Sequence, residues 1–174
     1  IGMSTSAEIK AGINLADDMP DNLVKENLGL PINSKTGEVA PIITPDGKTL
    51  FFTRLNHPDN LHDKKTEQRF IKQDIWYSKM SGSGLWSNAA NIGQPINNVE
   101  DNAAATVSAD GKKLYILNVY RNDKLLLGLS KTTNRNGTWS FPEEVKIDYF
   151  QALGTINKET GANEIKIEFS ISHD

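Results

Sequence analysis

The chain has 174 residues, of which 37% are hydrophobic and 24% are charged, as is typical of a soluble globular protein. Its formal net charge of -3 offers no basic surface for nucleic acid, and the absence of cysteine excludes disulfides, thiolate catalysis and zinc–thiolate sites. No apolar run reaches the roughly 18 residues that a membrane span needs, and residues 1–5 do not predict a signal peptide.

Residues 1–28 have the weakest pattern and are interpreted as an N-terminal segment that leads into the rest of the chain. Residues 7–15 are weakly amphipathic, residues 17–22 predict an acidic loop interrupted by proline, and residues 24–30 are consistent with a short strand.

An internal repeat begins at Gly29. The sequence Gly-Leu-Pro-Ile-Asn at 29–33 recurs as Gly-Gln-Pro-Ile-Asn at 93–97, an offset of 93 − 29 = 64 residues. The same offset continues without a gap from residues 40–51 to residues 104–115. Self-similarity of this kind predicts two copies of one structural unit.

The first part of each copy predicts a hairpin. In the first copy, residues 39–44 are an apolar run, predicted to be an inner strand buried on both faces, and residues 50–53 form its return strand. Pro41 must then lie where the ladder needs no N–H donor. Proline, aspartate and glycine at the turn favour tight turn geometry. Structural roles are therefore predicted for the turn residues Asp46, Gly47, Asp110 and Gly111.

The second part of each copy predicts two more strands. Residues 74–78 and 124–130 are predicted third strands. The segments around Trp86 and Trp139 are predicted outer strands, with the indoles packed between neighbouring sheets.

The first copy is longer than the second. Matching Ser78-Lys79 with Ser130-Lys131 gives an offset of 130 − 78 = 52, so an insertion of about a dozen residues is predicted within residues 56–73. This segment is polar, with at most a short helix near 67–72.

Residues 146–174 predict a weaker continuation of the same pattern. A strand at 152–157 and a turn at 159–161 are followed by residues 164–172, in which apolar and polar side chains alternate as in a strand with one wet face.

These motifs resemble the WD40-like, TolB-type β-propeller repeat of bacterial envelope proteins, over about residues 29–145. The second copy departs from the family pattern at Asn102, Ala105 and Ala109, and has three leucines at 125–127 instead of Asp-Ile-Trp. The resemblance is carried by Glu38, Pro41, residues 45–48 and 50–52, residues 74–76, Trp86 and residues 93–97.

The resemblance implies an all-β fold of propeller-type blades, each with four antiparallel strands. Blade 1 is expected at 29–92 with its insertion at 56–73, blade 2 at 93–145, and a degenerate partial blade at 146–174. Because propellers contain about four to eight blades, we expect the chain to be a fragment of a longer protein. Completion of the ring by other chains, or blades that have diverged beyond recognition, are the alternatives.

The resemblance also implies a function. We expect a non-catalytic scaffold that binds protein or glycan in the periplasm, or at the outer membrane or cell surface, of a Gram-negative bacterium such as a member of the Bacteroidetes, whose proteins of this kind often carry an OmpA-like domain. Other envelope proteins or glycan are the expected partners, and no cofactor is expected. The alternatives are the propeller portion of a peptidase or hydrolase with its catalytic domain outside this chain, and a carbohydrate-binding module.

No catalytic residue is predicted, because the sequence has no Gly-x-Ser-x-Gly elbow, phosphate loop or His-Glu-x-x-His motif. In the family geometry, Glu38, Arg54 and Arg121 lie at strand ends and would reach a central funnel, and local salt bridges are the alternative for them.

Two further groups of side chains have competing interpretations. The insertion contains weak candidates for metal ligands, although polar loops of this kind are usually only solvated. Tryptophan rings can stack on sugars, but their places in the strand pattern favour core packing. The metal candidates are His57, Asp59, His62 and Asp63, and the tryptophans are Trp76, Trp86 and Trp139.

Overall fold

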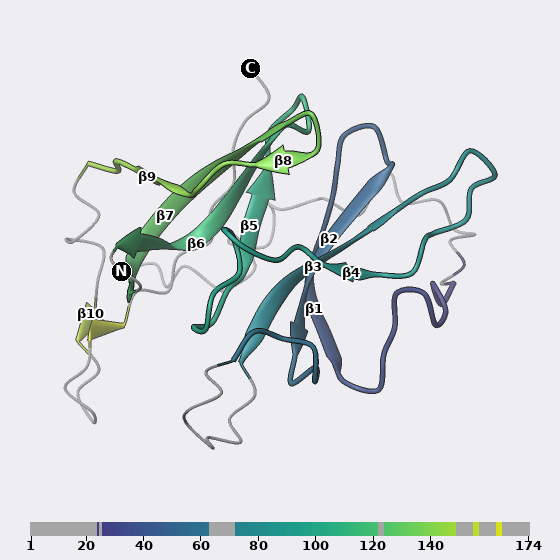
Figure 1. Cartoon of the computed structure of the whole chain (residues 1–174), viewed down its shortest axis with the longest axis horizontal. Helices are drawn as coiled ribbons and strands as arrows, with labels where there is room; N and C mark the ends of the chain where they lie inside the picture. The colour runs from purple at the N-terminus through teal and green to yellow at the C-terminus, as the bar shows by residue number, and fades with distance from the viewer. Residues whose placement is uncertain are drawn as a thin grey trace, which may run out of the picture.

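The computed structural model describes residues 24, 26–62, 72–121, 124–148, 155–156 and 163–164. These residues form strands, turns and loops, with no helix among them, so the all-β prediction is confirmed. Figure 1 shows two twisted antiparallel sheets side by side, and in the described part of the chain neither sheet closes on itself. The same residues include no helix that could span a membrane.

The first sheet is a four-stranded antiparallel meander. It contains β1 (Gly37–Ile43), β2 (Thr49–Leu55), β3 (Gln73–Lys79) and β4 (Ala90–Asn91), in that spatial order. The predictions for the first three strands are confirmed. The fourth strand is also present but is displaced along the chain, because Trp86 forms an isolated bridge with Met80 and β4 pairs with β3 four residues later, from Ala90.

The second sheet repeats this meander and adds one short strand. β7 pairs at its far end with β8, which contains Trp139, and nearer its middle with β9. Ser130 lies opposite Glu144 of β9, much as Trp76 lies opposite Asn91 of β4, so β9 occupies the position of the fourth strand. The strands are β5 (Ala104–Val107), β6 (Lys113–Arg121), β7 (Lys124–Arg135), β8 (Thr138–Trp139) and β9 (Glu143–Val145).

The two copies use the same turn chemistry. The Thr44 hydroxyl donates to Asp46 Oδ1 over 2.6 Å, and the Ser108 hydroxyl donates to Asp110 Oδ1 over 2.5 Å. The turn glycines that follow have φ values of 70° and 68°. Glycine adopts this left-handed conformation without steric cost, so the repeat found in the sequence is also a repeat in three dimensions.

The strand register corrects the sequence alignment of the third strands. Leu50 lies opposite Ser78, and its counterpart Leu114 lies opposite Thr132 rather than Ser130. The offset for these strands is therefore 132 − 78 = 54 residues. The matching Ser-Lys dipeptides therefore do not occupy equivalent positions. The second copy also has a bulge around Asn118, which has a φ of 75°.

The two sheets pack face to face, and each contributes a different face of the repeated unit to the contact. Phe51 and Ile75 of the first sheet share a core with Val107, Leu114 and Ile116 of the second. Neighbouring residues of a strand point to opposite faces. Leu50 and Phe52, the counterparts of Leu114 and Ile116, therefore lie on the far face of the first sheet, in a second cluster with Ile32 and Trp76.

The indole rings of Trp86 and Trp139 lie on equivalent faces of their own sheets, so they contact different cores. Trp139 packs against the core between the sheets, with its ring centroid 6.0 Å from that of Phe51. Trp86 packs against the second cluster, on the far face of the first sheet. Packing between neighbouring sheets is therefore confirmed for Trp139 alone.

β1 is less buried than predicted. Val39 is 41% exposed and Ile43 is 53% exposed, because β1 is an edge strand of the first sheet and pairs only with β2. The prediction that this strand is buried on both faces is wrong. Pro41 does lie where no ladder bond is needed, since the pairing skips from Val39 to Ile42 across a bulge.

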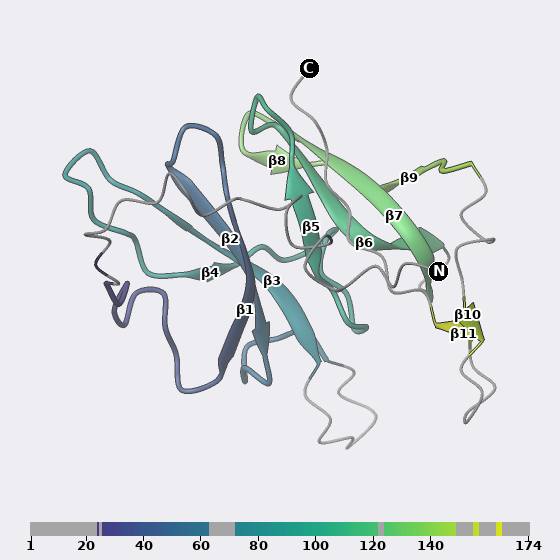
Figure 2. The same ribbon diagram turned by 180° about the vertical axis from the view of Figure 1, so that it is seen from behind.

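Only two short strands of the C-terminal region belong to the described residues. β10 (Thr155–Ile156) pairs antiparallel with β11 (Asn163–Glu164), within the first predicted strand and at the start of the second, while the predicted turn at 159–161 lies outside the described residues. Figure 2 shows this hairpin beyond the second sheet, on the side away from the first. The alternating stretch at 165–172, the segment at 1–23 and the helix predicted near 67–72, except for Lys72 itself, lie outside the described residues.

Candidate functional site

The segment between β4 and β5 connects the two sheets and sets the shape of the site. The carbonyl of Gly93 accepts hydrogen bonds from the N–H groups of Ile96 (3.2 Å) and Asn97 (2.9 Å), and Gly29 does the same for Ile32 (3.1 Å) and Asn33 (2.8 Å). Asn97 is fully buried. Its side chain fixes the segment to β3, and the neighbouring residues are left to line a pocket.

Glu38 and Arg54, two of the three predicted binding residues, form an ion pair with each other. The Arg54 Nε to Glu38 Oε1 distance is 3.2 Å, and the two side chains are 6% (Arg54) and 16% (Glu38) exposed. Burial lowers the pKa of Arg54, while the negative charge of Glu38 opposes this shift. Arg54 also donates to the carbonyl of Ile32 over 2.7 Å and lies 4.3 Å from the ring centroid of Trp76.

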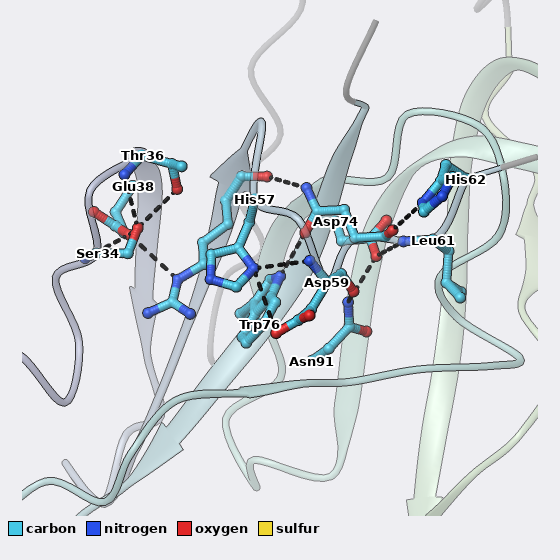
Figure 3. A network of polar contacts seen from close by, with 12 residues as sticks. Ser34, Thr36, Glu38, His57, Asp59, Leu61, His62, Asp74, Trp76 and Asn91 are labelled. Atoms are coloured by element: carbon cyan, nitrogen blue, oxygen red, sulfur yellow. Dashed lines mark hydrogen bonds and ion pairs between the residues drawn. The ribbon is translucent and has the colours of Figure 1, made fainter. Parts of the chain in front are cut away.

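This ion pair has a structural role. Glu38 Oε1 accepts hydrogen bonds from both the backbone N–H and the hydroxyl of Ser34, as Figure 3 shows. The pair thereby fastens the loop before β1 to the end of β2. Glu38 Oε1 and Arg54 Nη2 are bonded within the protein, and both side chains are largely buried, so Glu38 and Arg54 offer little to a ligand.

The second copy makes the same connection with uncharged groups. Asn102 replaces Glu38 and accepts from the N–H of Asn98 over 2.8 Å. Tyr120 replaces Arg54. Its hydroxyl donates to the carbonyl of Ile96 over 2.7 Å and accepts from Asn102 over 3.1 Å. Burial raises the pKa of Tyr120, which keeps the hydroxyl protonated. An ungapped alignment misses Tyr120, because it places Asn118 opposite Arg54.

The predicted metal candidates lie on the loop after β2. His57 Nδ1 is 3.9 Å from Asp59 Oδ2, and the His57 ring packs edge-on to Trp76 with a centroid distance of 4.5 Å. His62 Nδ1 is 3.0 Å from the carbonyl of Asn60. In the described part of the chain, no group of three or more metal-ligating side chains is found. Asp63 lies outside that part.

Asn60 and Asp74 hold this loop on the sheet, and neither role was predicted from the sequence. The Asn60 side chain is buried and accepts from the indole N–H of Trp76 over 2.9 Å. Asp74 Oδ2 accepts from the N–H of Leu61 and from the Asn91 side chain, both over 2.7 Å (Figure 3). Burial raises the pKa of Asp74, whose Oδ1 has no hydrogen-bond partner among the described residues.

Arg121, the third predicted binding residue, lies at a surface pocket of about 240 Å³. Its side chain is 60% exposed and forms an ion pair with Glu144 of β9. Phe141, which is 61% exposed, packs its ring edge-on against Tyr120 at a centroid distance of 6.3 Å. The side-chain amides of Gln94 and Asn98 complete the polar part of the lining, whereas the amide of Asn97, which also borders the pocket, is bonded to Ile75.

The chemistry of this pocket suits binding. Arg121 supplies a cation, the amides supply donors and acceptors, and Phe141 supplies an exposed ring. The lining residues that the structure describes include no carboxylate and no imidazole for proton transfer. Phe141 and the amides were not predicted, because both are distant from Arg121 in the sequence: Phe141 lies between β8 and β9, and the amides lie between β4 and β5.

Comparison of the chain with protein-family models, with curated proteins and with solved structures found no match.

Proposed function

We propose that the chain is a non-catalytic β-propeller repeat module that serves as a protein- or glycan-binding scaffold in the cell envelope of a Gram-negative bacterium. The two sheets act as successive blades, and further blades from a longer protein or from other chains continue the array. The proposal rests on the repeat geometry and on the resemblance of the sequence motifs to TolB-type repeats.

The observation that carries the proposal is the head-to-tail packing of the two sheets. Leu114 of the second sheet packs against Phe51 of the first, while Leu50, the counterpart of Leu114, lies on the opposite face. An interface that joins two different faces of the same unit does not terminate itself. It either continues or closes into a ring, and propeller blades are arranged in this way.

The pocket at Arg121 is the best candidate for the partner surface. It lies where the two units are joined, and it combines an exposed arginine with an exposed aromatic ring. Arginine and aromatic residues are enriched among the side chains that dominate binding energy at interfaces. The proposed scaffold therefore contacts its partner through Arg121 and Phe141.

A binding experiment with a matched variant tests this function. The full chain is immobilised and exposed to periplasmic proteins, outer-membrane proteins and peptidoglycan fragments from a Gram-negative bacterium. We expect a retained component whose affinity falls about tenfold or more with Arg121→Ala, as for the loss of a charge-assisted hydrogen bond. Arg135→Ala removes another exposed arginine of the second sheet and is the control.

Two results would overturn the proposal. The first is a component retained equally by wild type and Arg121→Ala. The second is hydrolysis of peptide, ester or glycoside substrates in proportion to the amount of purified chain, since a scaffold has no turnover.

A further inference from the structure

A second pocket, of about 230 Å³, opens between the two sheets near their hairpin turns. The turns lie together at one edge of the molecule, at the top of Figure 1. A Cβ atom added to Gly111 would be 3.7 Å from the Cγ2 of Thr44. The pocket is therefore built jointly by the two copies.

Three aromatic rings line this pocket. Phe51 forms its buried base, with Tyr77 on one side at a centroid distance of 6.4 Å and Trp139 on the other at 6.0 Å. The Phe51 and Trp139 planes meet at 73° and the Phe51 and Tyr77 planes at 46°. Rings tilted in this way enclose a concave space and present their electron-rich faces to polarised C–H groups.

Polar groups that have no ion-pair or hydrogen-bond partner among the described residues surround the rings. Lys79 Nζ lies 5.8 Å from the Tyr77 centroid and has no carboxylate partner among the described residues. Neither the Tyr77 hydroxyl nor the Asn134 side-chain N–H group has a hydrogen-bond partner in that part of the chain, although Asn134 Oδ1 accepts from Gly137 over 2.8 Å. A ligand that combines a C–H face with several oxygens would satisfy both kinds of surface.

The arrangement is specific to this interface and is not a general product of the repeat. The strand register places Lys131 of the second copy where the first has Tyr77, and Tyr115 where the first has Phe51. The corresponding face of the second sheet therefore lacks one wall of the aromatic enclosure. The described lining also includes one lysine and no acidic residue, so the pocket has a positive charge.

We propose that this inter-sheet pocket binds one pyranose ring that carries a carboxylate, as in an acidic glycan. The volume lies below the roughly 300–1,000 Å³ of sites for drug-sized ligands, and it suits a single ring. The sugar face stacks on Trp139, and Lys79 binds the carboxylate. This inference rests on the proposed function and gives the glycan alternative a definite site, separate from Arg121.

The test uses the full chain and two forms of one probe, a trigalacturonate and its methyl ester, which has the same rings without charge. The chain has three tryptophans, so their indole N–H signals in an NMR titration report the location of binding directly. The Trp139 signal is expected to shift. The Trp76 signal is expected to remain, because its N–H is bonded to Asn60. Wild type should bind the acid about tenfold more tightly than the ester.

Lys79→Ala should abolish this preference for the acid without affecting the fold, because Lys79 is exposed. Lys35→Ala, which removes an exposed lysine beyond the opposite end of β1, should leave the preference intact. An unshifted Trp139 signal at millimolar trigalacturonate, or equal affinity for acid and ester, would overturn the inference.

The failure of this inference is distinguishable from failure of the proposed function. If Arg121→Ala still weakens binding of the retained envelope component and trigalacturonate does not bind, only the inference of the sugar site is wrong. If Trp139 shifts and Arg121→Ala changes nothing, the sugar site is supported and the partner surface is wrong.

Discussion

The side chain of Asn97 hydrogen-bonds to both backbone groups of Ile75. Asn97 Oδ1 accepts from the backbone N–H of Ile75 over 3.0 Å, and Asn97 Nδ2 donates to the carbonyl of the same residue over 2.8 Å. Both backbone groups belong to β3, and buried backbone groups must be paired. The connection between the two sheets is thus fastened to the middle of the first.

Asn97→Ala should therefore destabilise the protein strongly. The substitution leaves the N–H group of Ile75 buried without a partner, at a cost of about 1–3 kcal/mol, while its C=O group keeps the hydrogen bond from the N–H of Ile92. Asn33→Ala is the matched control, because Asn33 holds the equivalent position but its side chain bonds only to Asn27 in the described part of the chain. Urea unfolding should show a loss at least about 1 kcal/mol larger for Asn97→Ala. Similar losses for the two variants would contradict this role.

The two ion pairs of the candidate residues should differ greatly in energy. Arg54→Ala leaves Glu38 without its partner at a largely buried site, and such losses cost about 3–5 kcal/mol. Arg121→Ala breaks an exposed pair, and the expected loss is below about 1 kcal/mol. Chemical unfolding of both variants makes the comparison. A small effect of Arg54→Ala would show that the buried pair is not needed.

Valine at either turn glycine should destabilise the fold by more than about 1 kcal/mol, because a β-branched residue is penalised at positive φ. The loss should be similar at the two positions, because a Cβ added to Gly111 meets Thr44 only at ordinary van der Waals distances and nothing lies within 4 Å of a Cβ added to Gly47. Gly82→Val is the control, since Gly82 has open space and no positive φ. Thermal melting ranks the three, and an unchanged melting temperature for Gly47→Val would contradict the turn geometry.

Asp74 should make the protein less stable as the pH rises. Burial raises the pKa of Asp74 above its ordinary value of 3.8, so the folded state binds its proton more tightly than the unfolded state does. The contribution of this group to stability is complete below pH 3.8 and is lost as the pH rises through the folded-state pKa.

The pH effect is measured by comparing the unfolding free energies of wild type and Asp74→Asn between about pH 4 and pH 7. The free energy of wild type relative to the variant should fall across this range. A difference that is constant or rises with pH would show that Asp74 ionises easily in the folded protein.

The repeat and its turns could be predicted because they depend on local chemistry. The hydrogen bonds from Thr44 to Asp46 and from Ser108 to Asp110 join residues two positions apart, so the sequence contains both partners. The strand pattern was predictable for the same reason. The exposure of Val39 was not, because burial of a strand depends on which neighbour covers it.

The polar contacts of the site could not be predicted, because their partners are distant in the sequence. Residues 56–73 have the composition of a solvated insertion, yet Asn60 is only 3% exposed and bonds to Trp76. Tyr120 substitutes for Arg54 only after the bulge at Asn118 has shifted the register. Neither fact follows from residue type or spacing.

The head-to-tail packing of the two sheets is tested most directly by engineered disulfides, since the chain has no cysteine. A Cβ added to Gly111 is 3.9 Å from the Cβ of Thr44, within the range of roughly 3.5–4.5 Å found in disulfides. The reciprocal pair is Gly47, the counterpart of Gly111, and Ser108, the counterpart of Thr44. In this pair, nothing lies within 4 Å of a Cβ added to Gly47.

The measurement is the intact mass of the two double variants after mild oxidation, with thiol labelling to count free cysteines. Thr44→Cys with Gly111→Cys should form an intramolecular disulfide, and Gly47→Cys with Ser108→Cys should keep both thiols free. A disulfide in the second pair, or free thiols in the first, would contradict the packing on which the proposed module rests.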